Sequence, residues 1–309
     1  MTEAPGGEIA DSIGFDRLRA ALQRAAVQVE RTLDEVLPKP AGLHARIPEA
    51  MRYAIFAGGK RLRPFLTLAS AGLFEVPPAR ALRVAAAIEA LHTYSLVHDD
   101  LPCMDDDDLR RGRPTTHKQF DEATAVLAGD GLLTLAFGIL ADPKTHPSGE
   151  VRAELVANLA RAGGSDGMIG GQMIDILAPE RDYGEAEVIL LQALKTGALF
   201  EFACEAGAIL AGAGEADRRR LSDFARGFGL AFQIADDLID VLGTAEEAGK
   251  AVGKDRDQGK ATLVSLLGVD RARAEAARLA KQAADALSPY GPAADDLRVL
   301  PFFLLDRPA

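Results

Sequence analysis

Cysteine is nearly absent from this chain of 309 residues, which contains only Cys103 and Cys204. Two isolated thiols cannot form a disulfide framework or a cysteine-based zinc site. Neither is accompanied by a Cys-x-x-Cys pattern or a histidine partner, so both are expected to be structural thiols. The cysteine content therefore predicts a reducing compartment, the cytoplasm.

Tryptophan and long apolar runs are also missing. Aromatic residues make up only 6% of the chain, so aliphatic side chains must supply most of the core. The longest nearly unbroken apolar run, residues 131–141, is well short of the roughly 20 residues that a membrane span needs. The first residues lack the basic flank and apolar segment of a secretion signal. Neither a membrane span nor secretion is predicted.

Positive charge is in deficit. The 35 basic residues face 46 acidic ones, which gives a net charge of -11. This sign argues against nucleic acid as a partner. Hydrophobic residues at 48% and charged residues at 26% are typical of a protein that folds into a globular core.

Strand-like alternation of β-branched residues is nearly absent, while Ala, Leu, Arg and Glu recur throughout. This pattern predicts an all-α fold, a single large helical bundle formed by residues 1–309, of which about 1–12 are expected to be flexible. Gly, Pro and charge predict loops near 142–149, 179–184 and 243–260. Helices are predicted at residues 15–37, 47–57, 64–73, 79–100, 123–141, 151–163, 165–177, 185–210, 215–241 and 262–287.

The first informative motif is a dense acidic cluster in which residues 99–108 carry six carboxylates. Such a run repels itself and is often a solvated loop. Here it follows an apolar helix and directly precedes the basic segment 110–113. These two features favour a site in which something positive lies among the carboxylates.

A second acidic cluster, Asp236, Asp237 and Asp240, lies on a predicted helix among apolar residues. Asp240 is only about 40° around the helix from Asp236, so both carboxylates share one face. Their burial without a counter-charge would cost several kcal/mol, and a bound cation is therefore expected. Oxygen ligands suit Mg²⁺, which often completes its shell with phosphate oxygens. A nuclease or phosphohydrolase could also use paired carboxylates with two metals.

The basic residues help to separate these alternatives. A glycine hinge, Gly58-Gly59, is followed by Lys60, Arg61 and Arg63 just before a predicted helix. Glycine permits close backbone approach, and Arg can grip phosphate oxygens. Alone, the segment would fit an ordinary polar turn equally well. His92, two turns before the first acidic cluster, would by itself be a core histidine.

Taken together, the motifs resemble the trans-prenyl diphosphate synthases, in particular the short-chain branch typified by bacterial farnesyl diphosphate synthases. Five motifs occur in the family's order between residues 58 and 268. They are Gly58-Gly59-Lys60-Arg61-Leu62-Arg63-Pro64, the aspartate-rich segment Asp99 to Arg113, Gly171-Gln172-x-x-Asp175, Lys195-Thr196-Gly197, and Phe232-Gln233 with Asp236-Asp237-x-x-Asp240.

The resemblance implies a helical bundle with a central cavity and a site that holds two diphosphates. It implies that more than one Mg²⁺ ion is bound by Asp99, Asp100, Asp105 and Asp236, with Asp237 and Asp240 acting through waters or behind these ligands. The allylic diphosphate would be held by Arg110, Lys195, Thr196, Gln233 and Lys254. The diphosphate of isopentenyl diphosphate would be held by Lys60, Arg63, His92 and Arg111. Asp106, Asp107 and Asp108 are left to shape a charged loop. Gln172 and Asp175 could equally share a hydrogen bond or line the cavity.

The implied reaction is ionisation of an allylic diphosphate, followed by attack of the double bond of isopentenyl diphosphate. Tyr94 and Ser95 precede Asp99 by one turn of helix. In resembling enzymes an aromatic residue at this place accompanies a C15 product, so farnesyl diphosphate is expected, with geranylgeranyl diphosphate (C20) as the alternative. A terpene cyclase would not need the second diphosphate site. From a different class, a non-catalytic subunit of a heteromeric synthase could lose ligands, yet every key position is filled. The resemblance also suggests a homodimer.

Overall fold

The computed structural model describes residues 12–242 and 261–306. The helices are α1 (Ser12–Val36), α2 (Arg46–Ile55), α3 (Leu62–Gly72), α4 (Pro78–Asp99), α5 (Thr116–Gln119), α6 (Glu122–Ala141), α7 (Gly149–Gly163), α8 (Met168–Leu177), α9 (Glu185–Gln192), α10 (Ala198–Ala211), α11 (Glu215–Leu242), α14 (Leu263–Leu267), α15 (Val269–Ala286) and α16 (Asp295–Leu305). Shorter helical turns are η1 (Gly42–His44), η2 (Ala178–Glu180), η3 (Ala193–Gly197) and η4 (Ser288–Ala294). The strands β1 (Leu109–Arg110) and β2 (Arg113–Pro114) form a small antiparallel hairpin. The predicted all-α fold is confirmed.

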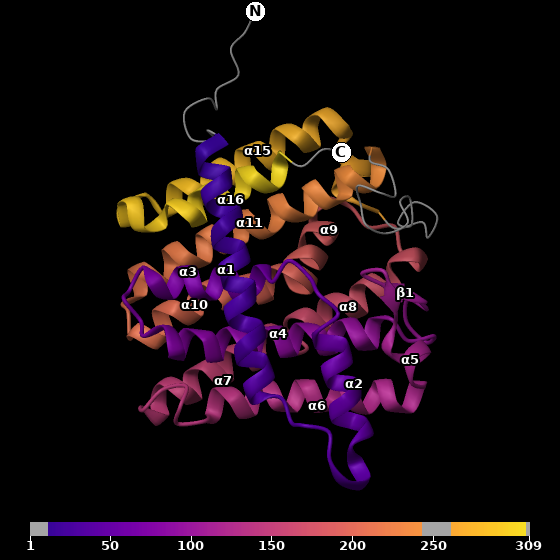
Figure 1. Ribbon diagram of the computed structural model, residues 1–309. Helices are drawn as coiled ribbons and strands as arrows, with labels where there is room; N and C mark the ends of the chain where they lie inside the picture. The colour runs from indigo at the N-terminus through magenta and orange to yellow at the C-terminus, as the bar shows by residue number, and fades with distance from the viewer. Residues whose placement is uncertain (1–11, 243–260, 307–309) are drawn as a thin grey trace, which may run out of the picture.

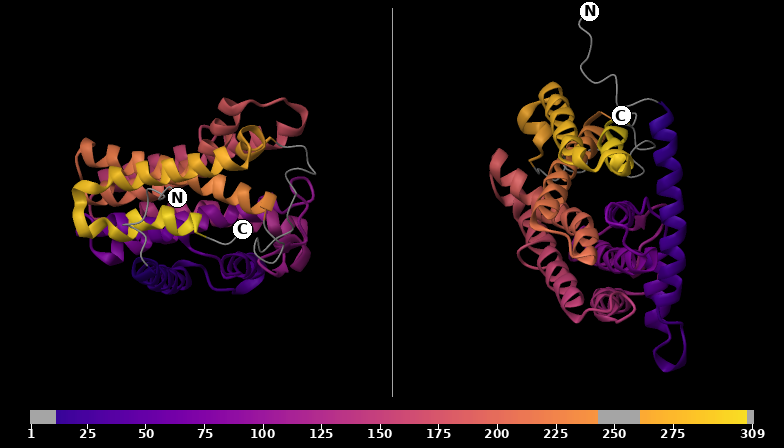
Figure 2. Two further views of the ribbon diagram at one scale, coloured as in Figure 1. Left: turned by 90° about the horizontal axis from the view of Figure 1, so that it is seen from above. Right: turned by 90° about the vertical axis from the view of Figure 1, so that its left-hand side faces the viewer.

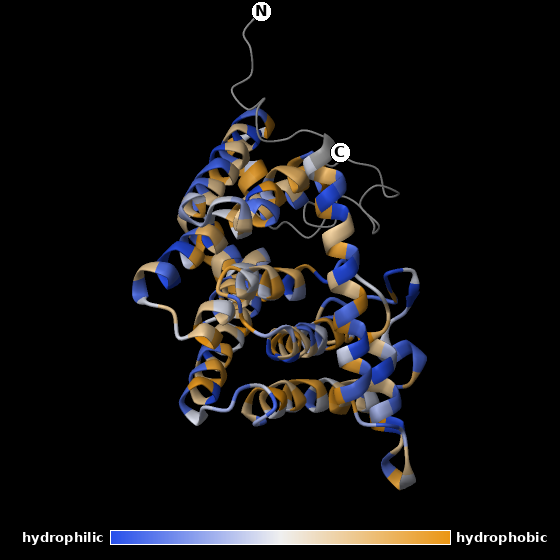
Figure 3. Cartoon of the chain, turned by 60° about the vertical axis from the view of Figure 1, so that its left-hand side comes forward, coloured by the Kyte–Doolittle hydropathy of each residue, from blue (hydrophilic) through white to orange (hydrophobic). Residues whose placement is uncertain are grey.

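The helices are stacked in tiers (Figure 1). Helices α11, α15 and α16 lie at the top of the view, α3, α4 and α10 in the middle, and α6 and α7 at the bottom, while α1 crosses the tiers. Figure 2 shows the same stack from above and from the side, with α1 along one flank. Hydrophobic residues gather where helices pack together and hydrophilic ones face outward, as amphipathic helices require (Figure 3).

Helix α4 lies at the centre of this packing. Its small and aliphatic residues are almost fully buried, among them Val84, Ala85, Ile88 and Leu91. Small side chains let neighbouring helices approach closely, and α4 contacts α1, α3, α6 and α10. The helix is therefore a rigid support for any side chain that its last turns present.

Two of the predicted helices are interrupted. The prediction of one helix over 185–210 is wrong, because a π-helical segment, η3, separates α9 from α10. The prediction of one helix over 262–287 is also wrong, because Gly268 adopts φ 78° between α14 and α15. Thr262 caps α14 by accepting a hydrogen bond from the Ser265 amide at 3.1 Å. Hydrophobic periodicity continues through both breaks and so does not reveal them.

Other elements differ from the sequence-based expectation in smaller ways. The hairpin β1–β2, the short α5 and the C-terminal α16 were not predicted, and the helix expected from residue 165 begins at Met168. The predicted loop at 243–260, which includes Lys254, lies outside the described residues. Among the described helices, α6 is the one with the length and hydropathy of a membrane span, a test that core helices also pass, and 44% of its apolar window is buried.

Candidate active site

The first acidic cluster lies at the C-terminal end of α4. Asp99 is the last residue of the helix, and the chain turns back so that the Asp105 amide donates to the Asp99 carbonyl at 2.8 Å. Burial raises the pKa of Asp99 to about 6; the nearby charge of Lys195 opposes this rise, and the carboxylate of Asp105 adds to it. We call Asp99, Asp100 and Asp105 the acidic group. Burial also raises the pKa of Asp100, so ionisation of both Asp99 and Asp100 is disfavoured.

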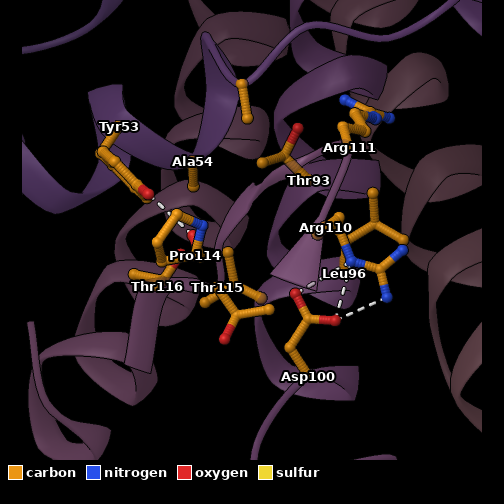
Figure 4. A pocket seen from close by; sticks show the side chains of 12 residues that line it. Tyr53, Ala54, Thr93, Leu96, Asp100, Arg110, Arg111, Pro114, Thr115 and Thr116 are labelled. Atoms are coloured by element: carbon orange, nitrogen blue, oxygen red, sulfur yellow. Dashed lines mark hydrogen bonds and ion pairs between the residues drawn. The ribbon is translucent and has the colours of Figure 1, made fainter. Parts of the chain in front are cut away.

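Asp100 belongs to this group but faces the hairpin (Figure 4). Its side chain is only 3% exposed, and both its oxygens accept hydrogen bonds from Arg110 Nε, at 2.8 and 2.9 Å. Arg110 Nη2 lies a further 2.6 Å from the Asp100 carboxylate. Burial lowers the pKa of Arg110, but the hydrogen bonds and charge of Asp100 outweigh it and leave that pKa raised. Asp100 thus orients an arginine that was predicted to hold a diphosphate.

The basic turn before α3 depends on unusual backbone conformations. Gly58 and Gly59 have φ of 91° and 125°. The guanidinium of Arg111 donates to the Gly58 carbonyl, and a Cβ atom on Gly59 would lie 2.5 Å from the Arg111 guanidinium carbon. Only glycine therefore allows the hairpin to approach the turn so closely. This contact places Arg111, from the hairpin, beside Lys60, from the turn.

Arg63 and His92 meet across α3 and α4. Arg63 Nη1 donates to His92 Nε2 at 3.2 Å, and the guanidinium carbon of Arg63 lies 4.6 Å from the ring centre of Phe200. Burial lowers the pKa of Arg63 to about 10. Burial and the charge of Arg63 hold the pKa of His92 well below its usual value, so the ring is neutral and accepts the hydrogen bond. We call Lys60, Arg63, His92 and Arg111 the basic group.

Lys195 and Thr196 lie in the π-helical segment η3, a geometry that is frequent at functional sites. Lys195 Nζ donates to Asp175 Oδ2 at 2.8 Å. Burial lowers the pKa of Lys195, but the charge and hydrogen bond of Asp175 outweigh it and leave that pKa raised. The charges of Asp99 and Asp105 act in the same direction, so Lys195 lies in the field of the acidic group.

Gln172 and Asp175 do not share the hydrogen bond that was one of the two alternatives left open by the sequence. Asp175 does make an internal contact, but with Lys195. Both amide atoms of Gln172 are buried and, within the described residues, have no hydrogen-bond partner. The backbone of Gly171 approaches η3 so closely that a Cβ atom there would lie 2.2 Å from the Lys195 amide nitrogen. Helix α8 therefore sets the position of Lys195.

The second acidic cluster lies on α11. Thr196 Oγ1 donates to Gln233 Oε1 at 3.4 Å, which joins η3 to α11 one turn before Asp236. Asp237 is 3% exposed and accepts from Gln233 Nε2 at 3.0 Å and from Gln192 Nε2 at 3.3 Å. Asp236 and Asp240 are half-buried. Segment η3 thus contacts the helix carrying the second cluster through Thr196, and its Lys195 lies in the field of the acidic group.

Three residues outside the predicted ligand set also lie close together. Asp106, Asp108 and His117 each place one ligand atom within 4.8 Å of the others. Asp108 Oδ1 is 2.8 Å from Lys118 Nζ, so an ammonium already pairs with this carboxylate. His117 follows the acidic segment by nine residues, a spacing that gave no sequence signal.

A pocket lined by α2, α4 and the hairpin lies beside the acidic group (Figure 4). Tyr53 closes one side by donating from its hydroxyl to the Pro114 carbonyl at 2.7 Å.

Tyr94, the predicted chain-length residue, is 5% exposed and packs edge-on against His98 with ring centres 5.6 Å apart. Ser95 Oγ donates to the His92 carbonyl at 2.9 Å. Three predicted site residues, Asp100, Arg110 and Arg111, line this pocket, whereas Tyr94 and Ser95 are not among its lining residues.

Comparison with known proteins gives consistent matches over most of the chain. A family model described as polyprenyl synthetase matches residues 44–288. Farnesyl diphosphate synthase of Geobacillus stearothermophilus is 45% identical over 248 residues, or 79% of this chain and 82% of that protein. A chloroplastic geranylgeranyl pyrophosphate synthase of Catharanthus roseus is 41% identical over 284 residues, or 91% and 78%. The apo crystal structure of an FPP/GFPP synthase from Zymomonas mobilis has a TM-score of 0.85 and 48% identity, covering 94% of this chain and 99% of that one.

Proposed function

The chain belongs to the polyprenyl synthetase family and is a short-chain trans-prenyl diphosphate synthase, and from this premise we propose that it makes farnesyl diphosphate. It would condense isopentenyl diphosphate with dimethylallyl diphosphate and then with geranyl diphosphate. One observation carries the proposal. His92 in the basic group and Asp99 in the acidic group lie two turns apart on one face of α4, about 10 Å along the helix. That spacing suits two diphosphate substrates bound side by side.

The acidic group has the chemistry of a magnesium site. Burial raises the pKa of Asp99 to about 6, with Asp105 adding to the rise, and a divalent cation would compensate such crowded carboxylates. We propose that Asp99, Asp105 and Asp236 hold Mg²⁺ together with an allylic diphosphate. Bound Mg²⁺ would neutralise the diphosphate as the C–O bond breaks. Asp100 would act by orienting Arg110, and Asp237 by orienting Gln233, with Asp240 one turn further along α11.

The cationic residues around the acidic group would hold the leaving diphosphate. Arg110 is oriented by Asp100 and Lys195 by Asp175, and each remains charged in its paired state. Fixed cations stabilise negative charge as it develops on the leaving group without having to reorganise. Thr196 and Gln233 would add hydrogen bonds to the same diphosphate. The residual allylic cation is then attacked by the second substrate.

The basic group would hold isopentenyl diphosphate. Arg63 and Arg111 offer guanidinium forks, and Lys60 an ammonium, to phosphate oxygens. Neutral His92 would donate from Nδ1 or turn towards the phosphate once Arg63 binds it. Attack on the allylic cation leaves a proton to be lost from the isopentenyl unit, and the released diphosphate is a base within reach of it.

Tyr94 supports a C15 product. It is buried on α4, one turn deeper than the acidic group, so its ring would block a growing chain that extends along the helix. A C20 product is the second candidate, because relatives named for both product lengths match this chain at 41–45% identity. Ser95, which is small, offers no such block.

Helix α6 supports assembly as a homodimer. Val126 and Leu127 are 40% and 54% exposed on a helix that is otherwise strongly apolar. An apolar patch of this kind is stabilised when a second copy covers it. We propose that residues 1–309 act as one domain and that two copies pair through α6. We place the protein in the cytoplasm, where the two cysteine thiols would stay reduced. A Leu127→Glu variant should sediment as a monomer.

The proposal is tested by incubating the purified chain with dimethylallyl diphosphate, isopentenyl diphosphate and Mg²⁺. The products are dephosphorylated and the alcohols are sized by chromatography. Farnesol as the main alcohol supports the C15 assignment. Geranylgeraniol as the main alcohol would replace it with the C20 alternative, and a requirement for another chain would point to a subunit of a heteromeric synthase.

A further inference from the structure

Arg61 lies between Lys60 and Arg63, yet its side chain turns away from the basic group. It is 0% exposed and sits at the N-terminal cap of α3 with φ 48°. Arg61 Nη1 donates to Glu89 Oε1 at 2.6 Å, and Nη2 donates to the Ile55 carbonyl at 2.5 Å. A left-handed conformation is unfavourable for a residue with a Cβ atom, so these contacts must hold it in place.

The same guanidinium joins three helices around the basic turn. Arg61 Nη2 also donates to Glu30 Oε1, on α1, at 3.1 Å. Ile55, whose carbonyl accepts from the same guanidinium, is the last residue of α2, and Glu89 lies on α4. Of the two carboxylates, the Glu89 side chain is 3% exposed and the Glu30 side chain 43%. The buried partner, Glu89, therefore dominates the interaction, because screening by water is weakest there.

Glu89 also acts on the other side of the turn. It lies three residues before His92, nearly one turn of α4. Burial lowers the pKa of Arg63 to about 10, and the charge of Glu89 opposes that shift while Arg111 adds to it. Glu89 is thus a buried anion beside a group of cations that repel one another.

We propose that Glu89 is a positioning residue for the diphosphate of isopentenyl diphosphate. It holds Arg61 in the left-handed cap between Lys60 and Arg63, and it supplies the negative charge that keeps these cations assembled before substrate binds. Glu89 does not touch the substrate. This role rests on the proposed function, since it concerns the second of the two diphosphate sites.

The test compares Glu89→Gln with a matched control, Asp142→Asn. Asp142 accepts from Arg83 Nη2 at 2.8 Å, so this pair, like Glu89 with Arg61, joins a carboxylate to an arginine. Arg83 lies near the N-terminal end of α4, far along the helix from the acidic group. Isopentenyl diphosphate binding is measured by calorimetry, and KM and kcat are measured for both substrates. Glu89→Gln should weaken isopentenyl diphosphate binding and raise its KM about tenfold, with kcat and the allylic KM within about twofold. Asp142→Asn should leave all four values unchanged.

Equal losses for both substrates, or unchanged binding of isopentenyl diphosphate by Glu89→Gln, would overturn the proposal. If Glu89→Gln does not fold, Glu30→Gln removes the more exposed partner of Arg61 and should raise the same Kd about threefold; an unchanged Kd there contradicts the role. If the unaltered chain binds isopentenyl diphosphate without condensing it, the proposed function fails while the calorimetric comparison still decides the role of Glu89.

Discussion

The acidic and basic groups, which α4 connects through Asp99 and His92 two turns apart, are electrostatic opposites. In the acidic group, burial raises the pKa of Asp99 to about 6. In the basic group, burial lowers the pKa of Arg63 to about 10 and holds that of His92 well below its usual value. Each shift means that the charged form is less favourable than in water. The first group would therefore be stabilised by a cation and the second by an anion, as the proposed metal-bound and metal-free diphosphate sites require.

The two groups also differ in how the fold builds them. The acidic group forms at the end of a helix, and its counter-charges, Arg110 and Lys195, come from a hairpin and a π-helical segment. The basic group forms at a turn in which Gly58, Gly59 and Arg61 have positive φ. A loss of charge in the acidic group should therefore affect the chemical step, whereas a loss in the basic group should affect the binding of one substrate.

The largest effect is expected from Asp99→Asn or Asp236→Asn. Either change removes a carboxylate proposed to hold Mg²⁺, and turnover should fall by about a thousandfold or more because the leaving diphosphate is no longer neutralised. Circular dichroism should show an intact fold. Asp108→Asn, in the segment that follows α4 but exposed and paired with Lys118, is the control and should keep turnover within about twofold. Near-normal turnover of the Asp99 variant would refute the metal assignment.

The next effect is expected from Arg63→Met in the basic group. Methionine retains contact with the Phe200 ring but removes the charge. The KM of isopentenyl diphosphate should rise by about 10- to 100-fold, because one charge-assisted contact with phosphate is lost. The KM of the allylic substrate should stay within about twofold, as steady-state kinetics with each substrate varied will show. A parallel rise of both values would mean that the two groups do not serve separate diphosphates.

A smaller effect on rate, but a change of product, is expected from Tyr94→Ala. Removing the buried ring, about one turn before Asp99 on α4, should let the chain grow, so that C20 and longer alcohols appear in the chromatogram. Tyr94→Phe is the matched control and should keep the C15 product, because the buried Tyr94 hydroxyl has no hydrogen-bond partner among the described residues. An unchanged profile for Tyr94→Ala would remove Tyr94 as the floor.

Helical periodicity, a local property, predicted the all-α fold. The membership of the two charged groups was implied by the family resemblance, and the structure brings Arg63 and His92 of the basic group into contact. The sequence did not predict the break at η3, since a π-helical segment keeps the apolar pattern and is set by the close approach of Gly171 to Lys195. The sequence also did not predict which distant charged residues form ion pairs. Asp175 with Lys195 and Arg61 with Glu89 are 20 and 28 residues apart, and only tertiary packing brings them together.

The smallest predicted effect concerns a third ionic group, at the start of α6, in which opposite charges are balanced. Asp121 accepts from the Thr124 amide at 2.7 Å and from Arg46 Nη2 at 2.6 Å. The Thr124 amide and the Arg46 guanidinium lower the pKa of Asp121 to about 2, the opposite of the shift at Asp99. This carboxylate needs no further cation. It shows how far hydrogen bonds and an ion pair can lower the pKa of an aspartate in this protein.

Asp121→Ala should remove the cap of α6 and lower the melting temperature by roughly 2–4 °C at pH 7. Because the folded pKa is depressed, the stabilisation by Asp121 is present above the unfolded pKa of about 4 and is lost as pH falls towards 2. The difference in melting temperature between the unaltered chain and the variant should therefore shrink over that range. Asp121→Asn keeps a capping oxygen without the charge and should lie between the two. A difference that stays constant from pH 7 to 2.5 would show that charge pairing contributes nothing here, and would weaken the electrostatic contrast drawn between Asp99 and Arg63.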